Sequence, residues 1–131
     1  MTPYYDDGQV ALHHGETREV LRGMAAESVH CVVTSPPYWS LRDYGIEASV
    51  WGGDWACSHE WSETVHEHHR GQVPDNMARE AGVAVAQREQ AAAFCLRCGA
   101  WYGCLGLEPT PELFTTHIVE VFREVRRVLR E

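Results

Sequence analysis

The chain has 131 residues, the length of one ordinary domain, and its hydrophobic content of 44% is typical of a packed protein rather than a disordered one. Its formal net charge of -8 does not fit a protein that holds duplex DNA unaided, which would usually present a basic face. The N-terminus lacks the basic start and apolar run of a signal peptide, and no apolar run reaches membrane-spanning length, so we expect a cytoplasmic protein without a membrane partner.

Two short apolar runs flank a helical segment at the start of the chain. Residues 10–14 predict a strand, and residues 18–24 predict a helix that Thr17 caps. The second run, residues 29–33, predicts a buried strand that places Cys31 in the core. A strand-helix-strand order favours a parallel pair with a right-handed crossover. This part of the chain therefore predicts the beginning of an α/β sheet.

Polar residues follow both predicted strands. Glu16 comes soon after the first strand, and Ser35 comes soon after the second. Ligands bind beyond the carboxyl ends of strands in open parallel sheets, so we expect these residues on one rim of the sheet. Glu16 also has a simpler interpretation, because an acidic residue is stabilised near a helix N-terminus.

The second predicted strand runs into a loop with the sequence Thr34-Ser35-Pro36-Pro37-Tyr38-Trp39. Proline cannot continue a strand ladder, and the residue before each proline is pushed to extended geometry. The loop is therefore expected to be stiff, with fixed carbonyls and a flat aromatic ring, which suits a planar base that carries an amino group. A surface turn is the alternative. A Pro-Pro-x-Tyr ligand of a groove-binding domain is excluded, because position 39 is tryptophan.

In this context the sequence Ser-Pro-Pro-Tyr resembles the catalytic loop of S-adenosylmethionine-dependent DNA methyltransferases that modify exocyclic amines. The resemblance runs from Val10 to the end of the chain and is nearest to phage-type enzymes with a Cys/His insertion. It implies that Ser35 and the carbonyl of Pro36 accept hydrogen bonds from the target amine. It implies as well that Pro37 belongs to the same catalytic loop. It also implies that Tyr38 stacks on a base flipped out of the duplex, which offsets part of the cost of flipping.

The same resemblance implies the rest of the reaction. The cofactor would be S-adenosyl-L-methionine, with Glu16 and Thr34 beside it, although enzymes of this type often carry aspartate where this chain has Glu16. The substrate would be double-stranded DNA, in a restriction-modification system of a bacterial or phage-infected cell. Serine at the first position of the motif favours cytosine N4 over adenine N6 as the methylated atom.

Residues 51–104 differ in character from the flanking sequence and are interpreted as an insertion. Residues 77–94 are rich in alanine and predict a helix, although Gly82 weakens that prediction. The insertion contains Cys57-x-His59 and, much later, Cys95-x-x-Cys98. Three thiolates and one imidazole form a closed tetrahedral set, which is how structural zinc is held. The resemblance supports this interpretation, because the phage-type enzymes carry a similar pair of motifs.

The cysteines also allow two alternative interpretations. They could be free and buried, or Cys95 and Cys98 could be a redox pair, although the surrounding sequence lacks a thioredoxin-like unit. Four further residues could replace one of the four proposed zinc ligands: His66, His68, His69 and Cys104.

The last part of the chain predicts a long helix. Thr110 is a good N-terminal cap, and Pro111 suits the first helical position. An apolar stripe at helical spacing consists of Phe114, Ile118, Val121, Phe122, Val125 and Val128 or Leu129. Its last turns hold four arginines, which the helix dipole favours there and which we interpret as a solvated face rather than a phosphate site: Arg123, Arg126, Arg127 and Arg130.

The sequence lacks the Phe-x-Gly-x-Gly turn around which the resembled enzymes build their cofactor pocket. We therefore predict an α/β fold that is a partial Rossmann-like methyltransferase sheet with a zinc-binding insertion. Residues 1–50 would be the N-terminal part of the catalytic domain, residues 51–104 the insertion, and residues 105–131 the C-terminal helix of the catalytic domain.

Two functional hypotheses follow. In the first, the chain is the catalytic part of a DNA amino-methyltransferase and needs a complementary C-terminal half to bind cofactor. In the second, it is a catalytically inactive remnant that zinc stabilises and that binds protein or DNA. Because two strands cannot cover a long amphipathic helix, both hypotheses predict an exposed apolar patch.

Overall fold

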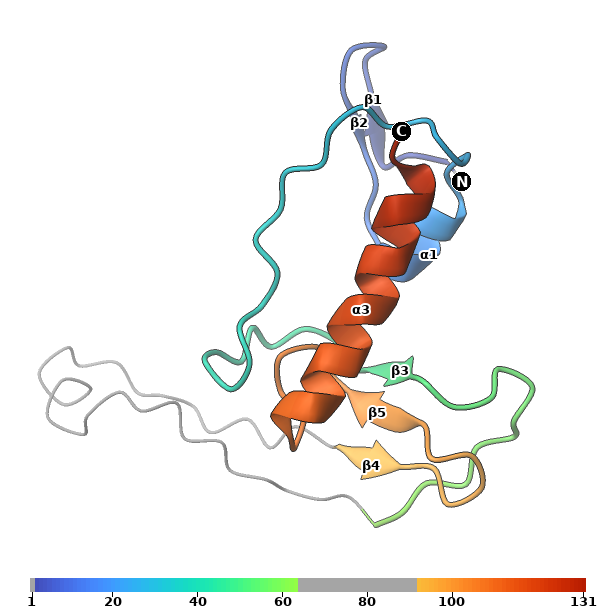
Figure 1. The fold of residues 1–131 in the computed structure, drawn as a ribbon, viewed down its shortest axis with the longest axis vertical. Helices are drawn as coiled ribbons and strands as arrows, with labels where there is room; N and C mark the ends of the chain where they lie inside the picture. Colours follow the sequence, from blue (N-terminus) through green and yellow to red (C-terminus); the bar gives the residue numbers. More distant parts are fainter. Residues whose placement is uncertain (1, 64–91) are drawn as a thin grey trace, which may run out of the picture. The chain divides into compact units, whose positions relative to one another are not determined.

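The computed structural model describes residues 2–63 and 92–131 (Figure 1). The chain forms two compact units: the first unit is Met1–Ser35 with Ile118–Glu131, and the second unit is Pro36–His117. Most of the segment 77–94, for which the sequence predicts a helix, lies outside the described residues, and its described end is wrong as a helix, since Ala93–Phe94 form a strand.

A short hairpin begins the first unit. Strands β1 (Tyr5–Asp6) and β2 (Ala11–Leu12) pair antiparallel. The side chain of Asp6 accepts a hydrogen bond from the backbone N–H of Gly8 at 2.8 Å, and Gly8 has a φ of 81°. A short acidic side chain that binds its own backbone and a glycine at positive φ together favour a tight turn. The first predicted strand is thus real but shorter than expected, and it pairs with the segment before it.

Helix α1 (Thr17–Arg22) follows the hairpin. Its N-terminal cap is Glu16, whose carboxylate accepts the backbone N–H of Glu19 at 3.1 Å. The prediction that Thr17 caps this helix is therefore wrong, since Thr17 is its first residue. A carboxylate one position earlier satisfies the same free N–H groups and is also stabilised by the helix dipole.

Helix α3 (Pro111–Val128) confirms the predicted C-terminal helix. It begins as expected, because the backbone N–H of Leu113 donates to Oγ1 of Thr110 at 3.2 Å and Pro111 is the first helical residue. Among the described residues, no helix combines the length and the apolar character that crossing a bilayer requires.

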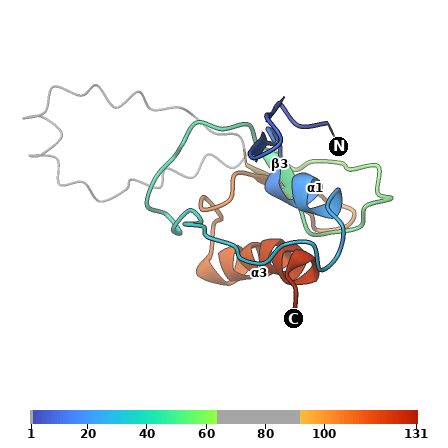
Figure 2. The same ribbon diagram turned by 90° about the horizontal axis from the view of Figure 1, so that it is seen from above.

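In the first unit, α1 lies beside the C-terminal half of α3 (Figures 1 and 2). The guanidinium of Arg127 donates to the carbonyl of Leu21 at 2.6 Å and to that of Met24 at 3.1 Å. Leu21 is in the last turn of α1 and Met24 lies just after the helix, where backbone carbonyls lack the regular partners of the helix interior. The buried guanidinium of Arg18 reaches Glu120 at 3.2 Å. Charged side chains therefore join the two helices at both ends of α1.

The predicted buried strand over residues 29–33 is wrong. The segment forms one isolated parallel bridge, between Val29 and Leu129, and Val33 is 95% exposed. The backbone of Val29 pairs with the end of α3, accepting the N–H of Arg130 at 3.0 Å and donating to the carbonyl of Val128 at 2.9 Å. The described residues hold two small antiparallel sheets and no Rossmann-like sheet, so the parallel strand-helix-strand prediction is also wrong.

The second unit is built on a three-stranded antiparallel sheet with the order β3-β5-β4. Its strands are β3 (Ser49–Trp51), β4 (Ala93–Phe94) and β5 (Trp101–Gly103). Trp51 lies opposite Trp101 in the ladder, and both side chains are buried. Gly103 leaves room for the Trp101 ring, which an added Cβ would approach to 2.2 Å. The small core therefore rests on two tryptophans and the small residues beside them.

Candidate functional site

The Pro-Pro loop, residues 34–39, is an exposed connection. Thr34 and Ser35 are exposed at the end of the first unit, and the remainder belongs to the second unit. Pro36 and Pro37 are half-buried, whereas Tyr38 is 66% exposed. An exposed ring next to two constrained residues is a suitable stacking surface, because every base has a π face.

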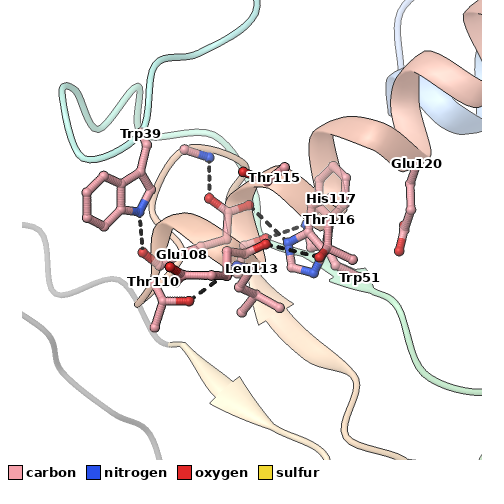
Figure 3. A network of polar contacts seen from close by, with 12 residues as sticks. Trp39, Trp51, Glu108, Thr110, Leu113, Thr115, Thr116, His117 and Glu120 are labelled. Atoms are coloured by element: carbon pink, nitrogen blue, oxygen red, sulfur yellow. Dashed lines mark hydrogen bonds and ion pairs between the residues drawn. The ribbon is translucent and has the colours of Figure 1, made fainter.

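The end of the Pro-Pro loop is fastened to a second loop, residues 104–108, which we call the glycine loop. The indole Nε1 of Trp39 donates to the carbonyl of Glu108 at 2.9 Å (Figure 3). The backbone N–H of Ser40 donates to the carbonyl of Gly106 at 2.7 Å. Two hydrogen bonds therefore fix the residues directly after Tyr38.

A buried acid and a buried histidine lie behind the glycine loop. Glu108 and His117 are 0% and 1% exposed, and their Oε1 and Nδ1 atoms are 3.0 Å apart. The other carboxylate oxygen of Glu108 accepts the backbone N–H of Gly106 at 2.8 Å. The imidazole stacks with both Trp51 and Trp101, whose ring centroids are 5.2 and 5.4 Å away. Both carboxylate oxygens are thus hydrogen-bonded beside an aromatic core, as buried polar groups generally are.

Glu16, the expected cofactor contact, has a local role in the described structure. Besides capping α1, its carboxylate accepts Nε of Arg18 at 2.9 Å. The simpler interpretation from sequence, stabilisation of a helix N-terminus, accounts for this geometry. Any contact with a cofactor would add to that role.

The structure brings together the four residues that the sequence singled out as a metal site. Cys57, His59, Cys95 and Cys98 place one ligand atom each within 4.8 Å of one another. The Cys57 and Cys95 sulfurs are 3.9 Å apart, and the Cys98 sulfur lies 3.5 Å from Nδ1 of His59. Tetrahedral zinc with bonds of about 2.3 Å to sulfur and 2.0 Å to nitrogen separates its ligands by roughly 3.5–3.8 Å. The residues therefore fit a four-coordinate zinc ion.

Backbone hydrogen bonds hold the two halves of this Cys/His cluster. Cys95 bridges Trp61 across an antiparallel pair, and its N–H donates to the carbonyl of Ala100 at 2.7 Å. The N–H of Gly99 donates back to the carbonyl of Cys95 at 2.9 Å. The resulting tight turn explains why the sulfurs of Cys95 and Cys98, only three residues apart, belong to the same cluster.

The thiols of the cluster ionise unequally. Burial, together with hydrogen bonds to Cys98 and Cys95, raises the pKa of Cys57 to about 11. Burial also opposes ionisation of Cys95, but hydrogen bonds from the backbone of Cys98 and from His59 lower its pKa to about 5. At neutral pH the cluster without metal therefore holds a thiolate at Cys95 and a thiol at Cys57.

Gly53 lies against the cluster and should not tolerate a side chain. A Cβ there would approach the Cys98 sulfur to 2.8 Å and Cβ of Ala100 to 2.6 Å, and Gly53 has a φ of 72°. We expect Gly53→Ala to weaken zinc retention. Gly99→Ala is the matched control, because Gly99 has the same φ but open space around it. Competition with a chromophoric chelator measures both variants, and equal retention would refute the packing argument.

The remaining cysteines lie outside the cluster. Cys31 is exposed, so its predicted place in the core is wrong. Cys104 is buried, and its thiol donates to the carbonyl of Ile46 at 3.3 Å. The three histidines considered as spare ligands lie outside the described residues.

Sequence reasoning missed Glu108 and His117. His117 is four and eight residues before Val121 and Val125, so it belongs to the buried stripe of α3 by helical spacing. That spacing was the available signal. No local sequence pattern marks Glu108 as buried.

Comparison with known proteins finds similarity over a short stretch. Type II methyltransferase M.XycI of Xanthomonas campestris pv. cyanopsidis is 59% identical over 39 residues, which are 30% of this chain and 13% of that protein. M.Cfr9I of Citrobacter freundii is 54% identical over 39 residues, and M.SmaI of Serratia marcescens is 61% identical over 40. The matched stretch spans 13–14% of the length of these curated relatives. No family model and no solved structure matches the chain.

Proposed function

We propose that this chain provides the base-binding loop and a zinc-stabilised insertion of a site-specific DNA methyltransferase. The reaction would transfer a methyl group from S-adenosyl-L-methionine to the exocyclic amine of cytosine or adenine. The observation that carries the proposal is the 59% identity to a type II methyltransferase over 39 residues. The sequence of the Pro-Pro loop and the exposure of Tyr38 support it.

The proposed chemistry needs few groups from the protein. Ser35 and the carbonyl of Pro36 accept hydrogen bonds from the amine, which draws its nitrogen toward tetrahedral geometry and frees its lone pair. The cofactor supplies an activated methyl group on a sulfonium. On transfer, an N–C bond would replace the C–S bond of the bound cofactor, and the amine proton would then leave to solvent. Tyr38 holds the flipped base by stacking.

Cofactor binding is proposed to involve Glu16 and Thr34 together with a methyltransferase portion outside these 131 residues. The short match to the relatives supports this division, because most of each relative has no counterpart in the matched stretch. The substrate is proposed to be double-stranded DNA, held mainly by that other portion, since this chain is acidic overall.

Zinc is proposed to be structural, held by Cys57, His59, Cys95 and Cys98. Four protein ligands leave no position for a reacting water. The ion would tie residues 57–59 to residues 95–98 across a long connection, which a small sheet alone would hold weakly.

Zinc affinity should fall as pH falls. Near pH 7 the ion must displace the proton of Cys57, whose pKa is raised, whereas Cys95 is already ionised. Affinity should therefore drop about tenfold per pH unit for each displaced proton, and more steeply below the pKa of Cys95. Calorimetric titration in buffers of different ionisation enthalpy measures the released protons. Affinity that stays constant between about pH 6 and pH 8 would contradict this assignment.

A methyl-transfer assay tests the proposed function. This chain is joined to the part of M.SmaI outside the matched 40 residues and incubated with DNA and labelled S-adenosyl-L-methionine. Intact M.SmaI is the positive control, and the M.SmaI remainder alone is the negative control. Label incorporated by the fusion and not by the remainder supports the proposal. Failure of a folded, zinc-loaded fusion would argue for the inactive binding module instead.

A further inference from the structure

The strongest unexplained feature of the second unit is the buried pair of Glu108 and His117. Burying a carboxylate is costly unless its oxygens are fully hydrogen-bonded. Both oxygens of Glu108 are engaged, one by the N–H of Gly106 at 2.8 Å and the other by Nδ1 of His117 at 3.0 Å (Figure 3). The pair belongs neither to the Cys/His cluster nor to the proposed chemistry.

The surroundings of His117 leave its ring little freedom. Trp51 and Trp101 stack on the imidazole at interplanar angles of 29° and 19°. The indole Nε1 of Trp51 donates to the carbonyl of Gly103 at 3.1 Å, which fixes that ring on β5. Because the two indoles confine the imidazole, its Nδ1 provides a fixed point for the Glu108 carboxylate.

Glu108 links His117 in the core to the Pro-Pro loop through hydrogen bonds. Its carboxylate fixes the backbone of Gly106, whose carbonyl accepts the N–H of Ser40 at 2.7 Å. Its own carbonyl accepts the indole N–H of Trp39 at 2.9 Å. Gly106 has a φ of 94°, and a Cβ there would come within 3.0 Å of Cβ of Pro37. The glycine loop thus contacts the chain on both sides of Tyr38.

The side chain of Tyr38 is mostly exposed, so the position of its ring depends on its neighbours in the chain. We infer that Glu108, oriented by His117, is a positioning residue that fixes the glycine loop and thereby sets where Tyr38 presents its ring to the base. The inference rests on the proposed function of the Pro-Pro loop. If Glu108 and His117 were purely structural, their loss would destabilise the sheet and the glycine loop equally. If they position the glycine loop, their loss should destabilise that loop before the sheet.

Amide and indole hydrogen exchange, followed by nuclear magnetic resonance on the zinc-loaded chain, tests this inference. In Glu108→Gln, the indole N–H of Trp39 and the amide of Ser40 should exchange about tenfold faster, because a bond to a charged group is replaced by a neutral one. The amides of Val50 and Tyr102, paired between β3 and β5, should keep their protection. Glu112→Gln is the matched control, since Glu112 is exposed at the start of α3.

If the sheet amides of Glu108→Ala stay protected, that variant provides a second test of the same kind. If they lose protection, the test rests on Glu108→Gln alone. Unchanged exchange at Trp39 and Ser40 in Glu108→Gln overturns the inference, and so does an equal loss of protection in loop and sheet. In the methylating fusion, Glu108→Gln should lower kcat more than it raises KM for DNA. A fusion that never methylates would refute the proposed function. The exchange data would still test whether Glu108 fixes the glycine loop.

Discussion

Cys95→Ser is expected to abolish stoichiometric zinc binding and to unfold the second unit around β4 and β5. Cys95 is 3% exposed, and its sulfur lies 3.9 Å from that of Cys57. Structural zinc sites contribute apparent binding free energies of about 10–16 kcal/mol in zinc-finger peptides at neutral pH, so losing one thiolate removes a large part of the folding energy. Elemental analysis of the purified, reduced protein should find about one zinc per wild-type chain and far less in the variant.

Cys31→Ser is the control for this substitution, because Cys31 is exposed and lies outside the cluster. It should leave zinc content and the thermal midpoint unchanged. Removing zinc from the wild type with a chelator should reproduce the effect of Cys95→Ser. A wild-type protein that melts at the same temperature with and without the metal would show that zinc does not stabilise the fold.

Tyr38→Ala and Ser35→Ala are expected to damage methylation in different ways. Loss of the Tyr38 ring removes stacking worth about 1–3 kcal/mol, which predicts a roughly 5- to 150-fold weaker hold on the flipped base. Ser35→Ala removes an acceptor needed chiefly as the amine becomes cationic, so it should lower kcat more than it weakens DNA binding. Steady-state kinetics of the fused enzyme separate the two effects.

Two control variants make this prediction specific. Tyr38→Phe retains the aromatic face and should retain much of the activity. Tyr44→Ala removes another exposed tyrosine outside the Pro-Pro loop and should have little effect. If a Ser35→Ala, Tyr38→Ala double variant methylates DNA as fast as the wild type, the loop has no part in catalysis.

Local signals predicted the C-terminal helix and the Cys/His cluster well. The Thr110 cap and the first helical proline act through neighbouring residues, so the start of α3 is readable from a few positions. The cluster is equally readable, because Cys95-x-x-Cys98 closes a tight turn by its own backbone bonds and complements Cys57 and His59 in ligand number.

The prediction failed where structure depends on distant partners. A five-residue apolar run such as residues 29–33 becomes a buried strand only if other strands pair with it and cover it, and its periodicity cannot supply that information. In the described structure Val29 instead pairs with the end of α3, and Val33 stays exposed. Glu108 shows the same limit from the opposite side, because its partner His117 is stacked on Trp51, which comes from a strand much earlier in the chain.

Mass spectrometry of nucleosides from DNA treated with the fused enzyme tests the central claim most directly, because it identifies the modified atom itself. We predict a new methylated amine, with N4-methylcytosine favoured by the serine at position 35, and its loss in the Ser35→Ala, Tyr38→Ala double variant. Methylation confined to a carbon atom of a base, or no methylated base from a folded and zinc-loaded fusion, would contradict it.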